Sequence, residues 1–211
     1  MRSEIVDGVV EHSDKFVPMN IAYIGLGSNL GDSLQVVMDA WTTLGTVPGI
    51  RLGRLSPPYR AEPVGMTGEN WFINAAGELL TVLSPQELLT CLHQIEEQFG
   101  RRRDSAVAGY QDRILDMDLL LYAQKVLRAK DLQIPHPAMQ DRLFVLLPMC
   151  DIAADVLHPV LGKRMKDLLA VLQAAGENPV VEKTIWPVDK GCCTVYDCSS
   201  VESVRKNPLK N

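Results

Sequence analysis

Asp116 and Asp118 lie one residue apart within the apolar segment RILDMDLLLY, residues 113–122. If this segment is a β-strand, both side chains project from one face, because alternate residues of a strand share a face. Their Cα atoms would then be about 6.5–7 Å apart. Two interpretations fit this pair. The carboxylates are either solvated on an exposed strand face, or they hold one or two hard cations, for which carboxylate oxygen is the natural ligand.

The rest of this segment predicts a strand that is fixed in the core. One face is apolar throughout and consists of Leu115, Met117, Leu119 and Leu121. The other face carries both carboxylates and consists of Ile114, Asp116, Asp118, Leu120 and Tyr122. We expect packing of the apolar face to set the direction in which the carboxylates point.

Four arginines lie just before the carboxylates in the chain: Arg101, Arg102, Arg103 and Arg113. A solvated surface loop would explain these charges alone. The chain has a formal net charge of −5, and these four arginines lie next to two aspartates. This combination favours a polyphosphate site. Asp116 and Asp118 would hold magnesium ions there, and guanidinium groups would bind phosphate oxygens. Phosphoryl-type transfer needs little beyond such positioning and charge neutralisation.

The segment IPHPAMQDR adds His136 and Arg142 as candidate nucleotide contacts. The prolines on both sides of His136 favour an extended chain, which fixes the direction of the imidazole. A structural histidine and a nucleotide contact both remain open for this residue.

The glycine-rich segment GLGSNLG, residues 25–31, is a weaker signal. Its spacing does not match a dinucleotide-binding fingerprint, and it lacks the lysine of a phosphate-binding P-loop. We interpret it as a tight turn after a short strand, with a role in shaping a pocket left open.

The remaining pattern predicts the elements that position these residues. Strands are expected at residues 21–27, 50–60 (interrupted by proline), 72–81 and 113–122, and helices after Asp32, from Ser84 to Gly100, and over 165–175. Ser84, Pro85 and Glu87 form a capping-box pattern at the start of the second helix. The order βαββαβ predicts an α+β fold, a ferredoxin-like sandwich whose mainly antiparallel sheet is covered by helices.

Composition limits the possible functions. The 211 residues, 46% of them hydrophobic, are typical of one globular domain. The acidic balance argues against nucleic-acid binding, and no apolar run is long enough for a membrane-spanning helix. Because the N-terminal residues lack an apolar signal core, we expect a cytoplasmic protein. We expect a polar extension at 1–19, one catalytic domain at 20–187 and a polar, cysteine-containing tail at 188–211.

Several segments in one order, from about residue 20 to 176, resemble the 6-hydroxymethyl-7,8-dihydropterin pyrophosphokinases of folate biosynthesis. They are AYIGLGSNLGD, FINAA, SPQELL, IEEQFGR, RILDMDLLLY, IPHPAM, RLFVLLPMCDIA and HPVLG. The resemblance implies transfer of the β,γ-diphosphate of ATP to the pterin hydroxymethyl group, with release of AMP. It also implies two magnesium ions on Asp116 and Asp118 and, as partners, ATP, the pterin and other enzymes of the folate pathway.

The resemblance assigns further roles by position. Arg101, Arg103 and Arg113 would contact phosphates, and His136 and Arg142 would help to hold ATP. The pterin would contact five residues: Val64, Phe72, Asn74, Tyr110 and Phe144. Two departures from the family pattern are the sequence YQDR at 110–113, where an aromatic lid is expected, and Ala61, where threonine is frequent.

Two other functions remain open at this stage. A ferredoxin-like sandwich could be a binding module without chemistry. The chain could also be a diphosphokinase that acts on a different hydroxymethyl heterocycle.

Overall fold

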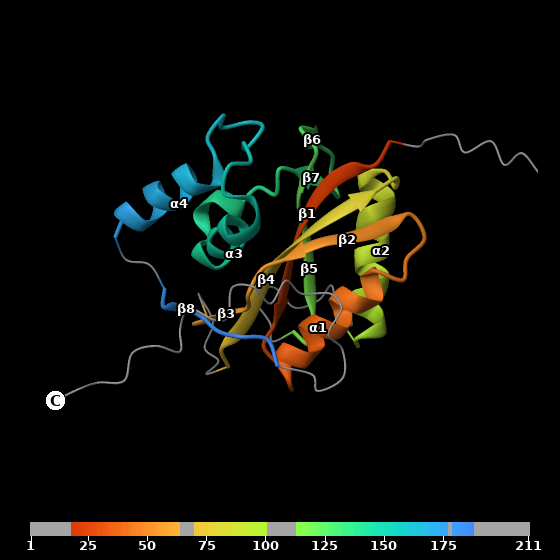
Figure 1. Ribbon diagram of the computed structural model, residues 1–211, viewed down its shortest axis with the longest axis horizontal. Helices are drawn as coiled ribbons and strands as arrows, with labels where there is room; N and C mark the ends of the chain where they lie inside the picture. The colour runs from red at the N-terminus through yellow and green to blue at the C-terminus, as the bar shows by residue number, and fades with distance from the viewer. Residues whose placement is uncertain (1–17, 64–69, 101–112, 177–178, 188–211) are drawn as a thin grey trace, which may run out of the picture.

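Six strands form one antiparallel sheet in the computed structural model, which describes residues 18–63, 70–100, 113–176 and 179–187 (Figure 1). The sheet order is β5-β1-β4-β3-β8, and β2 also pairs with β4. Every pairing between these strands is antiparallel. The predicted α+β class with a mainly antiparallel sheet is therefore confirmed.

The elements follow one another along the chain as β1 (Asn20–Ser28), α1 (Ser33–Leu44), β2 (Ile50–Leu55), β3 (Tyr59–Ala61), β4 (Phe72–Thr81), α2 (Pro85–Gln98), β5 (Asp116–Tyr122), β6 (Leu127–Arg128), β7 (Gln133–Ile134), a 3-10 helix (Met139–Asp141), α3 (Leu143–Ala153), α4 (Met165–Ala174) and β8 (Val181–Lys183). Strands β6 and β7 form a separate two-stranded ribbon. Among the described residues, no helix has the length and apolar character needed to cross a membrane.

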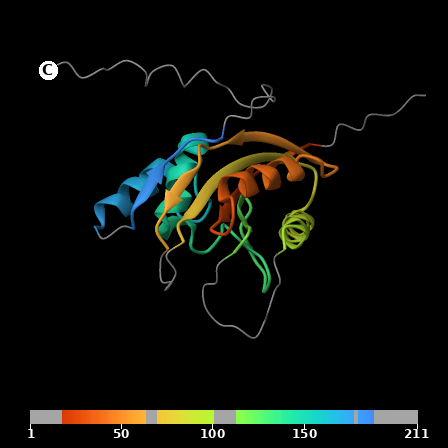
Figure 2. The same cartoon turned by 90° about the horizontal axis from the view of Figure 1, so that it is seen from below.

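Helices cover both faces of the sheet. Helices α1 and α2 pack with one core cluster, which includes Trp41 and Leu92, whereas α3 and α4 pack with a second cluster, which includes Leu146 and Met165. Figures 1 and 2 both show α3 and α4 on one side of the molecule and α1 and α2 on the other. Residues of the sheet thus contribute to a core cluster on each of its two faces.

The predicted helix starts are confirmed in atomic detail. The Asp32 side chain accepts a hydrogen bond from the Gln35 amide at 3.2 Å. In α2 the Ser84 amide donates to the Glu87 carboxylate at 2.7 Å and the Glu87 amide donates to the Ser84 hydroxyl at 3.3 Å. Both patterns satisfy amide groups that a helix N-terminus leaves without partners within the helix.

Strand β5 departs from the expected alternation. Ile24 of β1 pairs with Leu119, but Tyr23 pairs with Leu121, so Leu120 is the extra residue of a β-bulge. Beyond the bulge the faces are exchanged: Leu121 packs in the cluster of α3 and α4, and Tyr122 packs in the cluster of α1 and α2. The expectation of one unbroken apolar face through Leu121 was therefore wrong at its last position, although both carboxylates precede the bulge.

The strand expected at residues 21–27 is confirmed and contains the first half of GLGSNLG, so only the second half of this segment forms the turn. Gly25 and Gly27 lie within β1, which continues to Ser28. Gly31 lies in the turn and has a φ of +69°, a conformation that favours glycine. The two strand glycines face the carboxylates of β5, as described next.

Candidate functional site

Each carboxylate of β5 lies opposite a glycine of β1. Gly25 pairs with Asp118 and Gly27 pairs with Asp116, and all four residues line one pocket. Directly opposite residues of an antiparallel pair project from the same face, so a larger side chain at either glycine would stand beside a carboxylate. The glycines therefore leave space on the sheet surface next to the aspartates.

The two carboxylates repel each other at the pocket wall. Burial raises the pKa of Asp118, and the neighbouring Asp116 raises it further. His136 when it is protonated, and the guanidinium groups of Arg142 and Arg113, lower the pKa of Asp118. A cation bound between the carboxylates would relieve this repulsion, and carboxylate oxygens are ligands that Mg²⁺ accepts.

Arg113 is fixed at the start of β5 by two neighbours. Its guanidinium donates to the Asp116 carboxylate at 2.8 Å. Its backbone is held by Asn29: the Arg113 amide donates to the Asn29 side chain at 2.7 Å, and the Asn29 amide donates to the Arg113 carbonyl at 3.1 Å. Asn29 is buried and was not predicted as a site residue. The one signal for Asn29 in the sequence was its place in the polar run directly after β1.

His136 lies beside Asp118 with one defined tautomer. Its amide donates to the Leu120 carbonyl at 2.9 Å, at the bulge. Its Nδ1 accepts from the Ala138 amide at 3.3 Å, so the neutral ring carries its proton on Nε2, which lies 4.0 Å from an Asp118 oxygen. Burial lowers the pKa of His136, which keeps the ring neutral near pH 7. Nε2 is thus a hydrogen-bond donor at the edge of the carboxylate pair.

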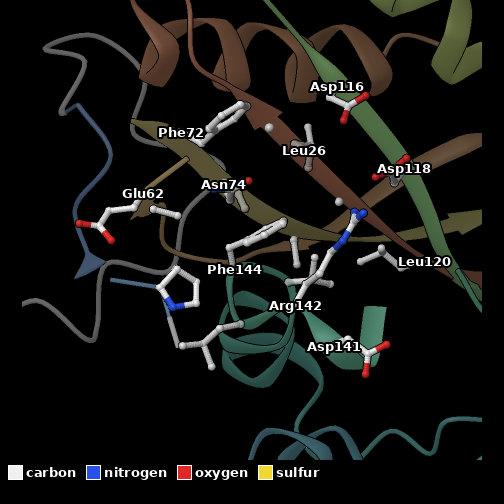
Figure 3. A pocket seen from close by; sticks show the side chains of 18 residues that line it. Leu26, Glu62, Phe72, Asn74, Asp116, Asp118, Leu120, Asp141, Arg142 and Phe144 are labelled. Carbon is white, nitrogen blue, oxygen red and sulfur yellow. The ribbon is translucent and has the colours of Figure 1, made fainter. Parts of the chain in front are cut away.

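Arg142 reaches the same region from the other side of the pocket. It precedes α3, and its guanidinium carbon lies 5.8 Å from the centre of the Phe144 ring. In Figure 3 its side chain extends from the α3 side toward Asp118. Positive charge from the α3 side and negative charge from β5 therefore meet in one part of the pocket.

The other end of the pocket is an aromatic slot with an amide at its base. Asn74 is buried on β4, and its Nδ2 has no hydrogen-bond partner among the described residues. In the view of Figure 3, Asn74 lies between the rings of Phe72 and Phe144. A buried amide without a partner costs free energy unless a ligand pairs with it. A flat heterocycle with polar edges fits this slot.

The predicted site residues thus fall into three groups. The pocket, about 200 Å³ in volume, is lined by Phe72, Asn74, Asp116, Asp118, Arg142 and Phe144. Arg113 and His136 contact or adjoin its carboxylates without lining it. Arg101, Arg103, Tyr110 and Val64 lie outside the described residues, and so does the cysteine-containing tail. Glu62, Asp141 and Pro179 line the pocket and were not predicted.

Another residue that was not predicted holds the carboxylate strand from the side of α2. Glu96 of α2 is 1% exposed, and its Oε1 accepts a hydrogen bond from the Met117 amide at 2.8 Å. Met117 lies between the two aspartates, on the edge strand of the sheet. Helix α2 therefore fixes the middle of the sequence Asp-Met-Asp through one buried side chain.

The described part of the chain contains no group of three or more His, Cys, Asp or Glu side chains that could hold a metal ion. Two carboxylates alone match the way in which Mg²⁺ is commonly bound, with a few protein ligands and with substrate phosphates. The Asp116 and Asp118 carboxylates therefore suit a metal ion that binds together with a polyphosphate. They suit a structural metal site, in which the protein supplies all ligands, less well.

Comparison with known proteins indicates the family to which this chain belongs. A family model described as 7,8-dihydro-6-hydroxymethylpterin-pyrophosphokinase (HPPK) matches residues 23–154, more than half of the chain. The 2-amino-4-hydroxy-6-hydroxymethyldihydropteridine pyrophosphokinase of Methylorubrum extorquens is 37% identical over 158 residues, which are 75% of this chain and 97% of the relative. The Bacillus subtilis protein of the same name is 38% identical over 137 residues, or 65% of this chain and 80% of the relative.

Solved structures agree at the level of fold. The Plasmodium falciparum HPPK-DHPS structure with pteroate has a TM-score of 0.59 and 14% sequence identity. The match covers 72% of this chain and 42% of that longer chain. The matched residues 23–154 contain Gly25 and Gly27 of β1, Asn74, both aspartates, His136 and Arg142. This chain belongs to the 7,8-dihydro-6-hydroxymethylpterin-pyrophosphokinase (HPPK) family.

Proposed function

We propose that this protein transfers the β,γ-diphosphate of Mg-ATP to the hydroxymethyl group of 6-hydroxymethyl-7,8-dihydropterin and releases AMP. Family membership and relatives named for this pyrophosphokinase activity support the reaction and its place in folate biosynthesis. The observation that carries the assignment is that one pocket contains both the carboxylate pair and the aromatic slot with the Asn74 amide. Such a pocket suits two substrates, one with phosphates and one with a flat heterocycle.

The aromatic slot is the proposed pterin site. Phe72 and Phe144 would lie against the two faces of the heterocycle, since aromatic rings favour offset stacking. The Asn74 amide, whose Nδ2 lacks a partner among the described residues, would donate to an acceptor on the ring edge. By family position, Val64 and Tyr110 would complete this site.

The carboxylate end is the proposed phosphate site. Asp116 and Asp118 would hold two Mg²⁺ ions, whose chemistry is to neutralise phosphate charge and orient the phosphate oxygens. The Nε2–H of His136 and the guanidinium of Arg142 are donors of the type that phosphate oxygens accept. Arg113, held by Asn29 and Asp116, would donate to the diphosphate as charge moves during transfer. Arg101 and Arg103 would add phosphate contacts by family position.

The bonds of the reaction assign the work of each group. The hydroxymethyl oxygen forms a bond to the β-phosphorus, and the bond from that phosphorus to the bridging oxygen of AMP breaks. The hydroxyl proton is lost as its oxygen attacks, and AMP leaves with the bridging oxygen. Positioning of the hydroxymethyl group by the slot and stabilisation of charge by the arginines would supply most of the rate.

Neither alternative function is favoured. In the pocket a carboxylate pair lies opposite the Arg142 guanidinium, with the His136 imidazole beside Asp118, and a binding module would not require this arrangement. The second alternative, a diphosphokinase that acts on another hydroxymethyl heterocycle, rested on Ala61 and on the sequence YQDR at 110–113. Ala61 lines the pocket, and residues 101–112 lie outside the described part of the chain. The relatives carry the pterin pyrophosphokinase name.

Three further expectations stay predictions: a cytoplasmic location, the absence of a nucleic-acid partner, and contact with other folate-pathway enzymes. The last has a parallel in the neighbour named HPPK-DHPS, in which the matching region is part of a longer chain.

A direct assay tests the proposed function. The protein is incubated with Mg-ATP and with or without 6-hydroxymethyl-7,8-dihydropterin, and adenine nucleotides are separated. We expect AMP only when both substrates are present, and none from Asp118→Asn. Formation of ADP, or no pterin-dependent nucleotide product from the wild-type protein, would contradict the proposal.

A further inference from the structure

The last described segment of the chain, residues 179–187, passes along β3 at the edge of the sheet, and we call it the C-terminal strap. Its β8 part pairs with β3, with Ala61 opposite Val181 and Tyr59 opposite Lys183. The strap lies beyond residue 154, where the family match ends. Figure 1 shows β8 beside β3.

Backbone hydrogen bonds fix the strap along its length. The Glu62 amide donates to the Val180 carbonyl at 3.0 Å, and the Thr184 amide donates to the Pro58 carbonyl at 2.8 Å. Farther along, the Trp186 indole donates to the Ser56 carbonyl at 3.0 Å, and the Trp186 side chain packs against the first core cluster. The strap is therefore part of the folded domain from Val180 to Trp186.

One end of the strap forms a wall of the pocket. Pro179 lines the pocket together with Ala61 and Glu62. The Val180 amide donates to the Glu62 carboxylate at 3.3 Å, which ties the strap to this pocket residue a second time. Ala61 ends β3 and pairs with Phe72 of the aromatic slot, and Glu62 follows Ala61 directly. Pro179 thus lies at the heterocycle end of the pocket.

A charged bridge joins the strap to the helix that carries Phe144. Asp151 of α3 accepts from the Tyr59 hydroxyl at 2.6 Å and from the Lys183 ammonium at 2.8 Å. One carboxylate therefore connects β3, β8 and α3. Phe144 is the second residue of the same helix, so this bridge links the strap to the element that carries the Phe144 ring.

We propose that Pro179 of the C-terminal strap is a pterin-contacting residue that sets the affinity of the pocket for the heterocycle and not for ATP. The inference rests on the proposed function, because it takes the heterocycle to be a pterin. Proline is suited to this position, since its ring offers apolar contact and has few conformations to lose on binding.

Two substitutions at Pro179 test the proposal in the full-length protein. Pro179→Ala removes apolar contact, and Pro179→Trp fills the space that the heterocycle needs. Binding of 6-hydroxymethylpterin is measured by titration in the presence of an ATP analogue with a methylene bridge between Pα and Pβ. Binding of that analogue alone and the thermal midpoint are measured for each variant. The control is Glu182→Ala, at an exposed strap residue outside the pocket lining.

We expect pterin affinity to fall about tenfold in Pro179→Ala and further in Pro179→Trp. Affinity for the ATP analogue and the thermal midpoint should stay at the wild-type and control values. Pterin affinity within twofold of wild type in both variants would overturn the inference. So would an equal loss of pterin and ATP affinity with a lowered midpoint, because the strap would then be a structural brace only. If the wild-type protein itself bound no pterin, the proposed function would fail first.

Discussion

Gly25 of β1 lies directly opposite Asp118 of β5, and this pairing opens the sheet surface beside the carboxylate. A Cβ added at Gly25 would lie 3.6 Å from the nearest Leu120 side-chain atom, an ordinary contact distance. The glycine is therefore not required by packing at that position. The space is required by whatever binds beside Asp118.

Gly25→Val should consequently fold but lose activity. Its branched side chain would occupy the space beside Asp118 and displace bound phosphate or metal, so we expect kcat/KM to fall by about 10²-fold. Gly25→Ala, the matched smaller change, should lose less. Steady-state kinetics and thermal midpoints of both variants check this, and wild-type turnover in Gly25→Val would contradict the account of the glycines.

Asp118→Asn should abolish transfer while it stabilises the ligand-free protein. Because burial and Asp116 raise the Asp118 pKa, the free energy of unfolding decreases as pH rises from the ordinary value of 3.8 through the raised value. The amide removes this penalty at pH 7. The side chain is 41% exposed, so we expect a gain of only about 1–3 °C in thermal midpoint.

Mg²⁺ separates the two effects in the same variant. Addition of Mg²⁺ with an ATP analogue should raise the midpoint of the wild-type protein more than that of Asp118→Asn. An equal rise in both proteins would count against Asp118 as a metal ligand.

Arg113→Ala should slow the chemical step by about 10²–10³-fold, because a donor to the transferred group is lost. Arg113→Lys should recover part of the rate, since it keeps the charge but not the planar, forked geometry of the guanidinium. Rapid-quench single-turnover measurements separate this step from product release. If both variants turned over at the wild-type rate, Arg113 would only brace Asp116.

Glu96→Ala should destabilise the protein by about 1–3 kcal/mol, because the buried Met117 amide loses its acceptor. The middle of the carboxylate strand would also be less firmly held, so the apparent affinity for Mg-ATP should fall. Glu96→Gln keeps an acceptor oxygen and should restore most of both properties. Urea unfolding and nucleotide titration check this, and equal behaviour of the Ala and Gln variants would refute it.

Acid sensitivity should depend in part on His158. This residue is 4% exposed, its Nδ1 accepts from the Val160 and Leu161 amides, and burial lowers its pKa from the ordinary value of 6.5. The unfolded chain binds a proton more readily than the folded chain below that value, so the free energy of unfolding falls as pH drops through it.

His158→Asn keeps an acceptor for the two amides and removes the titration. We expect its unfolding free energy to decrease less between pH 7 and pH 5 than that of the wild-type protein. Denaturant unfolding at several pH values measures this difference, and parallel pH profiles would contradict the role of His158.

Local signals made much of this structure predictable. Helix caps at Asp32 and Ser84 depend on contacts between residues three apart, and the sequence contains them in full. The common face of Asp116 and Asp118 follows from strand alternation, which the first half of β5 obeys. The family resemblance then pointed to Phe72, Asn74, Arg142 and Phe144, which line the pocket.

Features that leave no signal in the neighbouring residues of the sequence could not be predicted. The bulge at Leu120 lies in a run of apolar residues, where a shift in alternation leaves no trace in the sequence. Helix α3 was missed because it is apolar on nearly all sides and contains Pro148, which usually interrupts a helix. Asn29, Glu96 and Pro179 act through partners far away in the sequence, and only the fold brings those partners together.

The central claim is that a diphosphate moves as one unit, and ATP labelled at the β-phosphorus tests it most directly. After a single turnover with Mg²⁺ and 6-hydroxymethyl-7,8-dihydropterin, the products are separated and the label is located. We predict unlabelled AMP and a labelled pterin product in equal amounts. Label retained in ADP, with one unlabelled phosphate on the pterin, would contradict the account.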